Sequence, residues 1–217
     1  MRNFLLFQES WRNITHFASE DPHRVVDFLQ KEIDSAVNHK NRARCTRSLF
    51  YLVKIHYILP SSLSCMNVIK EGNHAVFAGG FSDIWKGRTA DGGSPVCLKV
   101  LRIFVNNGVQ NVDTIISKFC REALVWRNVK HPNVLPFLGV NKELFAASFC
   151  LISPWMDNGD IMSFLCHHPR LDRLKSITGV VGGTAHLHSL EPPIVHADIR
   201  GVSSISQQHH TVLQPYL

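Results

Sequence analysis

Two charged residues lie among apolar neighbours in the middle of the chain, and they could pair across an inner surface. Lys99 is the only charged residue in the run Val96–Leu101, which has the composition of a buried strand. A buried ammonium group is unfavourable unless an anion lies beside it. Glu122, on the flank of the apolar face of a predicted helix, can supply that anion. The alternatives are a lysine that reaches solvent from a strand edge and an exposed helix carboxylate.

A glycine pair, Gly79-Gly80, lies between two predicted strands, 20 residues before Lys99 (99 − 79 = 20). Glycine allows a turn in which backbone N–H groups come close to phosphate oxygens. The alternative is a plain hairpin turn. The chain contains no G-x-x-x-x-G-K-[ST] string, so a Walker A loop is excluded.

A third polar group follows the last predicted helix, in the segment His196–Gly201. Asp198 lies between apolar residues and can act as a base or orient a hydroxyl group. Arg200 suits an anionic phosphoryl group. The alternative is a surface loop with an incidental ion pair.

The elements that must position these groups follow an α+β order. The turn signal Asp91-Gly92-Gly93 predicts a hairpin in front of the Lys99 strand. Strands and helices do not alternate as they do in βαβ winding. Strands are predicted over 75–77, 83–87, 95–101, 134–140 and 147–152, and helices over 112–126, 160–166 and 171–190.

The first seventy residues are predicted to be helical. Asp21-Pro22 is typical of a helix start, and apolar residues recur at helical spacing from Val25 to Val37. The segment Leu59–Ser62 predicts a break. The basic stretch Lys40–Arg47 is interpreted as a solvated helix face. Nucleic acid or anionic lipid are alternative partners for it, although no aromatic residues are interleaved with the basic ones.

The composition excludes several classes of protein. A length of 217 residues with 45% hydrophobic and 18% charged residues suits one large globular domain, or a domain with an arm. No apolar run reaches the roughly 18 residues of a membrane span, and the N-terminus does not resemble a secretory signal. Six cysteines without a C-x-x-C pair predict no metal site and a reducing compartment, cytoplasmic or nuclear. The net charge of +6 suits a partner that carries phosphate.

Taken in order, these residues resemble the eukaryotic protein kinases, closest to the tyrosine-kinase-like group, over about residues 72–201. The segment Phe77–Ile84 is similar to the glycine-rich loop, and Lys99 and Glu122 to the ATP-binding lysine and its helix partner. Leu151–Asp160 resembles the gatekeeper-to-hinge segment, with Ser153 at the gatekeeper. His196–Gly201 resembles the catalytic loop.

The resemblance implies ATP as cofactor, a protein substrate or partner protein, and a role for each site residue. Asp198 would face the substrate hydroxyl, and Arg200 would replace the lysine that contacts the transferred phosphate. The Met156 backbone would lie against adenine, and Asp160 near the ribose. The implied nucleotide-binding residues are Gly79, Gly80, Ile84, Cys97, Lys99, Glu122, Met156 and Asp160.

The chain also departs from the family pattern. Phe77 and Ser82 stand at two of the three glycine positions of the loop, and Ala197 replaces the arginine beside the catalytic aspartate. Ser203 stands where the family has a metal-binding asparagine, and no D-F-G or A-P-E string occurs. Mg²⁺ is expected for the family, but its ligands are missing here. We therefore expect a chain truncated after the catalytic loop, without measurable kinase turnover.

The implied fold is α+β, with a kinase-like N-lobe of antiparallel sheet plus one helix, the first helices of the C-lobe, and a helical arm in front. We expect a helical arm over 1–70 and an incomplete kinase-like domain over 71–217. That domain would contain an N-lobe (71–156), a partial C-lobe (157–201) and a tail outside the family pattern (202–217). Two other functions stay open. One is a non-catalytic kinase-like module that binds nucleotide or protein. The other, less favoured, is a basic nucleic-acid-binding protein that uses residues 39–47.

Overall fold

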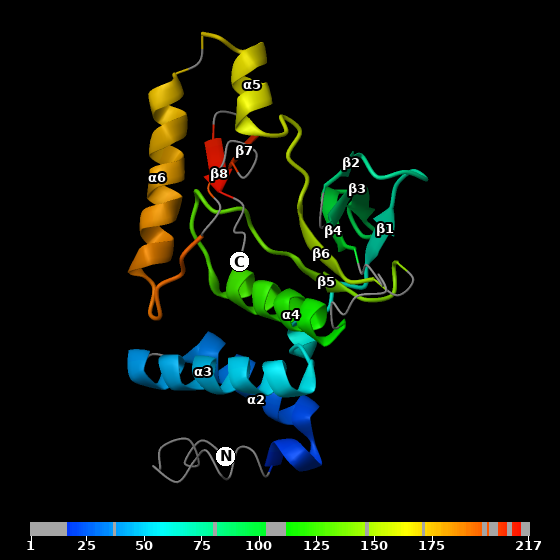
Figure 1. Cartoon of the computed structure of the whole chain (residues 1–217), viewed down its shortest axis with the longest axis vertical. Coiled ribbons are helices and arrows are strands. Elements are labelled where there is room, and N and C mark those ends of the chain that lie inside the picture. The colour runs from blue at the N-terminus through cyan, green and yellow to red at the C-terminus, as the bar shows by residue number, and fades with distance from the viewer. Residues whose placement is uncertain are drawn as a thin grey trace.

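The structure is a computed structural model of the 217-residue chain. It describes the ranges 17–36, 38–79, 82–102, 112–145, 148–170, 172–196, 199, 204–207 and 210–213. As predicted, the architecture is α+β, with an antiparallel sheet, one helix against it, and further helices on either side along the chain (Figure 1).

The sheet is antiparallel throughout, and its strand order is β1-β3-β4-β6-β5, with β2 also paired to β3. The predicted hairpin between β3 and β4 is confirmed. Gly93 has a φ of +64°, which favours glycine, and its N–H donates to Thr89 O at 3.0 Å. The strands are β1 (Val68–Lys70), β2 (Phe77–Ala78), β3 (Ser82–Thr89), β4 (Pro95–Leu101), β5 (Gly139–Asn141) and β6 (Cys150–Pro154).

Alternation along β4 gives the sheet two different faces. Val96, Leu98 and Val100 are buried in one apolar cluster, together with Cys150 and Ile152 of β6. The residues between them, Cys97 and Lys99, therefore point to the opposite face. Directly paired residues share a face, so Ile84 and Leu151, which flank Lys99 in register, lie there as well.

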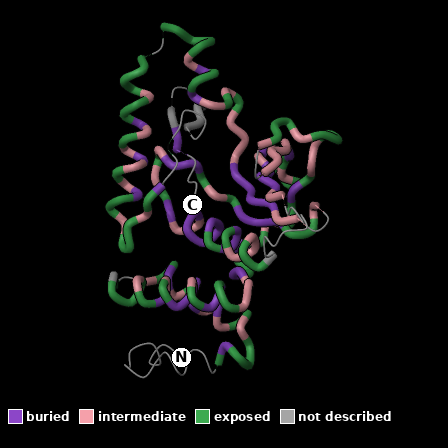
Figure 2. Tube along the Cα trace, in the orientation of Figure 1, coloured by how far each residue is buried: buried purple, intermediate pink, exposed green. Residues whose placement is uncertain are grey.

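Helix α4 (Val112–Asn128) belongs to the main core, and nearly all of its middle is buried. The sequence predicted one apolar face, but the buried residues Phe119, Cys120, Ala123, Leu124 and Trp126 spread over more than one side of the helix. The physical reason is that a second layer covers α4 (Figure 2).

That second layer is the pair α2 (Pro22–Ser35) and α3 (His39–His56), which lies alongside α4 in Figure 1. The predicted start of α2 is confirmed, because Asp21 caps it by accepting a hydrogen bond from the Arg24 N–H at 3.0 Å. Buried residues of both helices, such as Leu29 and Leu49, share one cluster with α4. The N-terminal helices thus pack directly on the helix that carries Glu122.

Two further helices follow the sheet, α5 (Ile161–His167) and α6 (Arg173–Ser189). Asp160 and Asp172 cap them, each accepting two backbone hydrogen bonds. Helix α6 packs against β8 (His210–Leu213), which pairs with β7 (Ser204–Gln207) in a separate two-stranded sheet. The sequence analysis predicted no strands there.

Three predicted strands differ from the structure, and β1 lies at the end of the segment that was predicted to be helical. The strand expected over 75–77 is the two-residue strand β2, Phe77–Ala78. The strand expected over 134–140 is confined to β5, because Pro136 has no N–H to donate and interrupts the ladder. Val134 instead forms an isolated bridge to Leu213, and Leu213 N–H donates to Asn133 O at 2.8 Å. The strand expected over 147–152 begins at Cys150 and continues to Pro154.

Candidate functional site

Lys99 and Glu122 meet between the sheet and α4. Lys99 Nζ lies 2.6 Å from Glu122 Oε1. Lys99 is 4% exposed and Glu122 is 7% exposed, so both groups are withdrawn from bulk water. The pairing predicted from the two anomalous charges is confirmed, since the register of β4 directs Lys99 to the side on which α4 packs.

A buried ion pair of this kind is a weak argument for stability. Taking two charges out of water offsets much of their attraction, and removing one partner typically destabilises by about 3–5 kcal/mol, because a lone charge stays buried. Apolar residues of similar size at positions 99 and 122 would stabilise the fold at least equally. The pair therefore points to a use for a fixed cation at this place in the sheet.

The sheet face around Lys99 is mostly apolar or uncharged. Ile84 and Cys97 are partly buried there, and Cys97 lies opposite Ser153 in register. Burial raises the pKa of the Cys97 thiol to about 11, against the smaller opposing effects of a hydrogen bond with Ser153 and the charge of Lys99. Cys97 is therefore a neutral thiol at physiological pH, and the surface beside Lys99 suits an uncharged flat group.

The glycine turn lies over the same end of the sheet. Gly79 N–H donates to Ser82 O at 2.9 Å, and a Cβ on Gly79 would stand 3.2 Å from that oxygen. Behind the turn, Arg102 pairs with Asp83, and this hydrogen bond holds the pKa of the Asp83 carboxyl below its usual range. Phe77 is 65% exposed next to the turn. Gly80 lies outside the described residues.

The segment after β6 leads from the sheet to α5. Trp155 N–H donates to Pro95 O at 3.1 Å, and Met156 packs partly buried against the main core. A turn follows, in which Gly159, with a φ of +62°, donates its N–H to Met156 O at 3.1 Å. This turn aims Asp160 at the start of α5.

Asp160 has a local role that the sequence analysis missed. Its Oδ1 accepts the N–H groups of Met162 and Ser163, each at 3.0 Å, and its Oδ2 accepts Ser163 Oγ at 2.8 Å. Partial burial raises the pKa of Asp160, but the hydrogen bonds from Ser163 and Met162 outweigh it and hold that pKa below its usual range. The signal was available, since an aspartate just before an apolar helical run is typical of an N-cap.

Comparison with known proteins decides the family. A family model described as "Protein tyrosine and serine/threonine kinase" matches residues 71–212, which is well over half of the chain. The chain belongs to the protein kinase family. The match continues past residue 201, where the resemblance was expected to end, and includes β7 and most of β8.

Individual relatives agree with this assignment. The chain is 31% identical over 146 residues to "Interleukin-1 receptor-associated kinase-like 2" of Bos taurus, an alignment that covers 64% of this chain and 22% of that protein. It is 29% identical over 143 residues to "Probable serine/threonine-protein kinase pats1" of Dictyostelium discoideum (59% and 4%). It is 28% identical over 145 residues to "Serine/threonine-protein kinase TNNI3K" of Mus musculus (65% and 16%).

The interleukin-1 receptor-associated kinase-like and TNNI3K relatives place the chain in the tyrosine-kinase-like group. The chain spans about a fifth or less of the length of these three relatives. Its sheet with α4 corresponds to a kinase N-lobe, and α5 and α6 to part of a C-lobe.

Some of the predicted kinase residues are not among the residues that the structure describes. Asp198, Arg200 and Ala197 lie outside the described residues, as does Ser203. His196, just before them, is described and is only 2% exposed.

The described ranges contain no group of three or more His, Cys, Asp or Glu side chains arranged to hold a metal ion. None of the described helices combines the length and apolar character that crossing a bilayer requires.

Proposed function

We propose that this chain binds ATP on the sheet face that carries Lys99. The observation that supports this most is the buried ion pair between Lys99 and Glu122, with 2.6 Å between Nζ and Oε1. Glu122 fixes the ammonium group in one position, where it can neutralise charge on the α- and β-phosphates. The family resemblance gives the same assignment.

The other proposed contacts surround this pair. The backbone at Gly79 and Gly80 would approach the phosphates, as a tight glycine turn allows. Ile84 and Cys97 offer a partly buried, uncharged surface for the adenine ring, and the Met156 backbone would lie along its edge. Asp160 would lie near the ribose. Both of its carboxylate oxygens already accept hydrogen bonds from α5. We therefore expect that a ribose hydroxyl would share one of these oxygens with its present donor.

By family, we propose transfer of the γ-phosphoryl group of ATP to a hydroxyl group of a protein substrate. Relatives are named as serine/threonine and dual-specificity kinases, so serine, threonine and tyrosine hydroxyls are all candidate acceptors. Asp198 would orient the hydroxyl and accept its proton, and Arg200 would contact the transferred phosphate. ATP supplies the phosphoryl group and leaves as ADP.

For residues 1–217 by themselves we propose nucleotide binding without measurable turnover. Ser203 stands at the position of the metal-binding asparagine, and these residues contain no D-F-G string. The loss of one well-placed electrostatic group typically lowers a rate by about 10²–10³. Phosphoryl transfer depends on charge neutralisation, so the absence of two metal ligands should lower its rate by more than the loss of one such group.

Thermal unfolding with and without ATP tests the binding proposal. Since a ligand that binds only the folded state raises its stability, millimolar ATP should raise the Tm of the wild-type chain. The double variant Lys99→Met/Glu122→Leu removes both charges together, so it should fold but lose the ATP response. Lys118→Met, an exposed lysine on the same helix as Glu122, is the matched control and should keep it. An unchanged ATP response in the double variant would contradict the proposal.

A radiolabel assay tests turnover and separates two functions. Purified chain, γ-labelled ATP, Mg²⁺ and a generic protein substrate should give no transfer above background. Transfer that Asp198→Asn abolishes would show an active kinase and refute the inactivity proposal. ATP-dependent stabilisation without transfer would instead assign a non-catalytic nucleotide-binding module, which the intact Lys99–Glu122 pair allows.

A further inference from the structure

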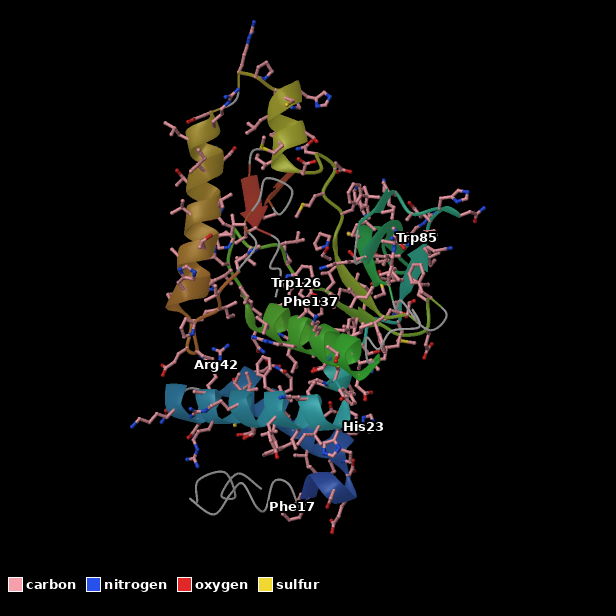
Figure 3. All side chains as sticks on the ribbon, in the orientation of Figure 1. Phe17, His23, Arg42, Trp85, Trp126 and Phe137 are labelled. Carbon is pink, nitrogen blue, oxygen red and sulfur yellow. The ribbon has the colours of Figure 1, made fainter. Side chains whose placement is uncertain are left out.

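A cavity lies between α3, α4 and the segment that follows α6, away from Lys99. Its volume is about 980 Å³, and it shares no lining residue with the proposed ATP site. One wall is basic and comes from α3 and α4. The other wall is mostly apolar and comes from residues 189–195. Figure 3 shows Arg42 on the side of α3 that faces α4 and the end of α6.

Three arginines line the basic wall: Arg42 and Arg47 from α3, and Arg121 from α4. All three are exposed, and within the described ranges their guanidinium groups form no ion pair and no hydrogen bond. The one carboxylate among the lining residues is Glu191. Since like charges around one cavity repel each other, an anion there would be favoured.

The apolar wall is unusual for a surface loop. Pro192, Pro193 and Val195 are exposed, and Val195 has 67% of its surface open to solvent. Phe50 and Val125 extend this apolar surface from the helices into the floor of the cavity. A ligand that fits both walls must therefore combine a compact anion with adjoining apolar groups.

We propose that this cavity binds a phosphorylated serine, threonine or tyrosine side chain of a partner polypeptide. A phosphomonoester carries about two negative charges and three acceptor oxygens, and guanidinium groups can bind it in a bidentate way. The residues next to the phosphorylated one would rest on Pro192 and Val195. The site lies apart from Lys99, so it operates whether or not ATP binds.

The lining favours a peptide over other polyanions. A nucleic acid needs a row of cations along its backbone and gains from stacked aromatic residues, whereas this cavity gathers its cations at one place and has one aromatic residue, Phe50. A lipid bilayer presents a flat surface that cannot enter a concave site. Lys40 and Arg44, also basic and exposed on α3, do not line the cavity.

Fluorescence polarisation on the full 217-residue chain tests the proposal. The probe is a labelled Ala-Leu-Ala-phosphoserine-Leu-Ala-Ala peptide in about 0.15 M salt, compared with its unphosphorylated form. We expect the phosphopeptide to bind at least about tenfold more tightly. Arg42→Gln/Arg121→Gln should remove most of that difference. The matched control Arg44→Gln, on the same helix but outside the cavity, should change the affinity less than about twofold.

Several results would overturn the proposal. They are equal binding of the two peptides, an equal loss of affinity in the Arg44→Gln control, and failure of millimolar orthophosphate to displace the probe from the wild-type chain. A single-stranded RNA 12-mer or phosphatidylserine vesicles could also bind more tightly than the phosphopeptide, with the same dependence on Arg42 and Arg121. That result would show that the cavity binds nucleic acid or lipid and not a phosphopeptide. Orthophosphate displacement needs no variant, so the proposal stays testable even if the double variant does not fold.

Discussion

At the scale of single residues, burial decides which groups are available for chemistry. Lys99 is buried because Glu122 lies beside it, whereas Cys97 and Cys120 stay neutral because their burial outweighs the effect of the nearby cations Lys99 and Lys142. Lys99 was recognisable in the sequence as the only charged residue of an apolar run. The sequence also offered Glu122 as the partner of Lys99, but it could not show how deeply each cysteine is buried, because burial depends on the packing of other elements.

The cysteines make this testable. Burial raises the pKa values of Cys97 and Cys120 to about 11, and only the thiolate is nucleophilic. Exposed Cys166 should therefore react with iodoacetamide in the native protein at pH 8, and Cys97 and Cys120 about a hundredfold more slowly. Mass spectrometry of timed samples measures this, with urea-unfolded chain as the control. Native labelling of Cys120 as fast as Cys166 would contradict the burial.

A pair of histidines predicts a pH dependence of stability. The rings of His131 and His186 stack at 4.6 Å between centroids. Burial, and then the nearby His131, hold the pKa of His186 below its ordinary value. The unfolded chain thus takes up a proton that the folded chain resists, so the free energy of unfolding should fall as the pH drops from about 7.5 toward 5.5.

The variant His186→Gln isolates this contribution, because other histidines in the chain titrate over the same range. Urea unfolding at several pH values should show a shallower pH dependence for His186→Gln than for the wild type. The same slope in both proteins would mean that His186 titrates alike in the folded and unfolded chain.

At the scale of elements, the local signals in the sequence were sufficient for the hairpin at Gly93 and the start of α2 at Asp21. The same signals placed the start of β5 too early. The predicted strand began at residue 134, but Pro136 interrupts the pairing and β5 begins only at Gly139. The local signals also could not show that α3 covers α4, since hydrophobic periodicity reports an apolar face and not its neighbour. The burial of α4 on two sides is a tertiary property.

Packing of α3 on α4 should contribute strongly to stability. Leu49 of α3 is fully buried in the cluster that contains Phe119 and Ala123 of α4. Leu49→Ala should lower the free energy of unfolding by about 2–5 kcal/mol. Ile55→Ala, at a position that is 49% exposed on the same helix, should lower it by less than about 1 kcal/mol. Equal effects in urea unfolding would mean that α3 is not held against α4.

At the scale of the whole molecule, one packed core joins the N-terminal helices, α4 and the inner face of the sheet. The candidate ATP site lies within this unit, and the proposed phosphopeptide cavity lies at its outer side, where α3 meets the end of α6. Much of α6 is exposed (Figure 2), including Leu174, Ile177 and Val181. The fold class and the Lys99–Glu122 pair were predictable from the sequence, but the outer cavity was not, because its walls are distant in the chain.

The proposed ATP site places Lys99 against the phosphates of the bound nucleotide. An acyl-phosphate derivative of ATP transfers its acyl group to a lysine amine held beside the phosphates, and mass spectrometry then identifies that lysine. We predict that Lys99 is the main labelled residue, that excess ATP blocks its labelling, and that exposed Lys118 is labelled only weakly with or without ATP. Labelling of Lys99 that excess ATP does not reduce, or no labelling of Lys99 at all, would contradict the account.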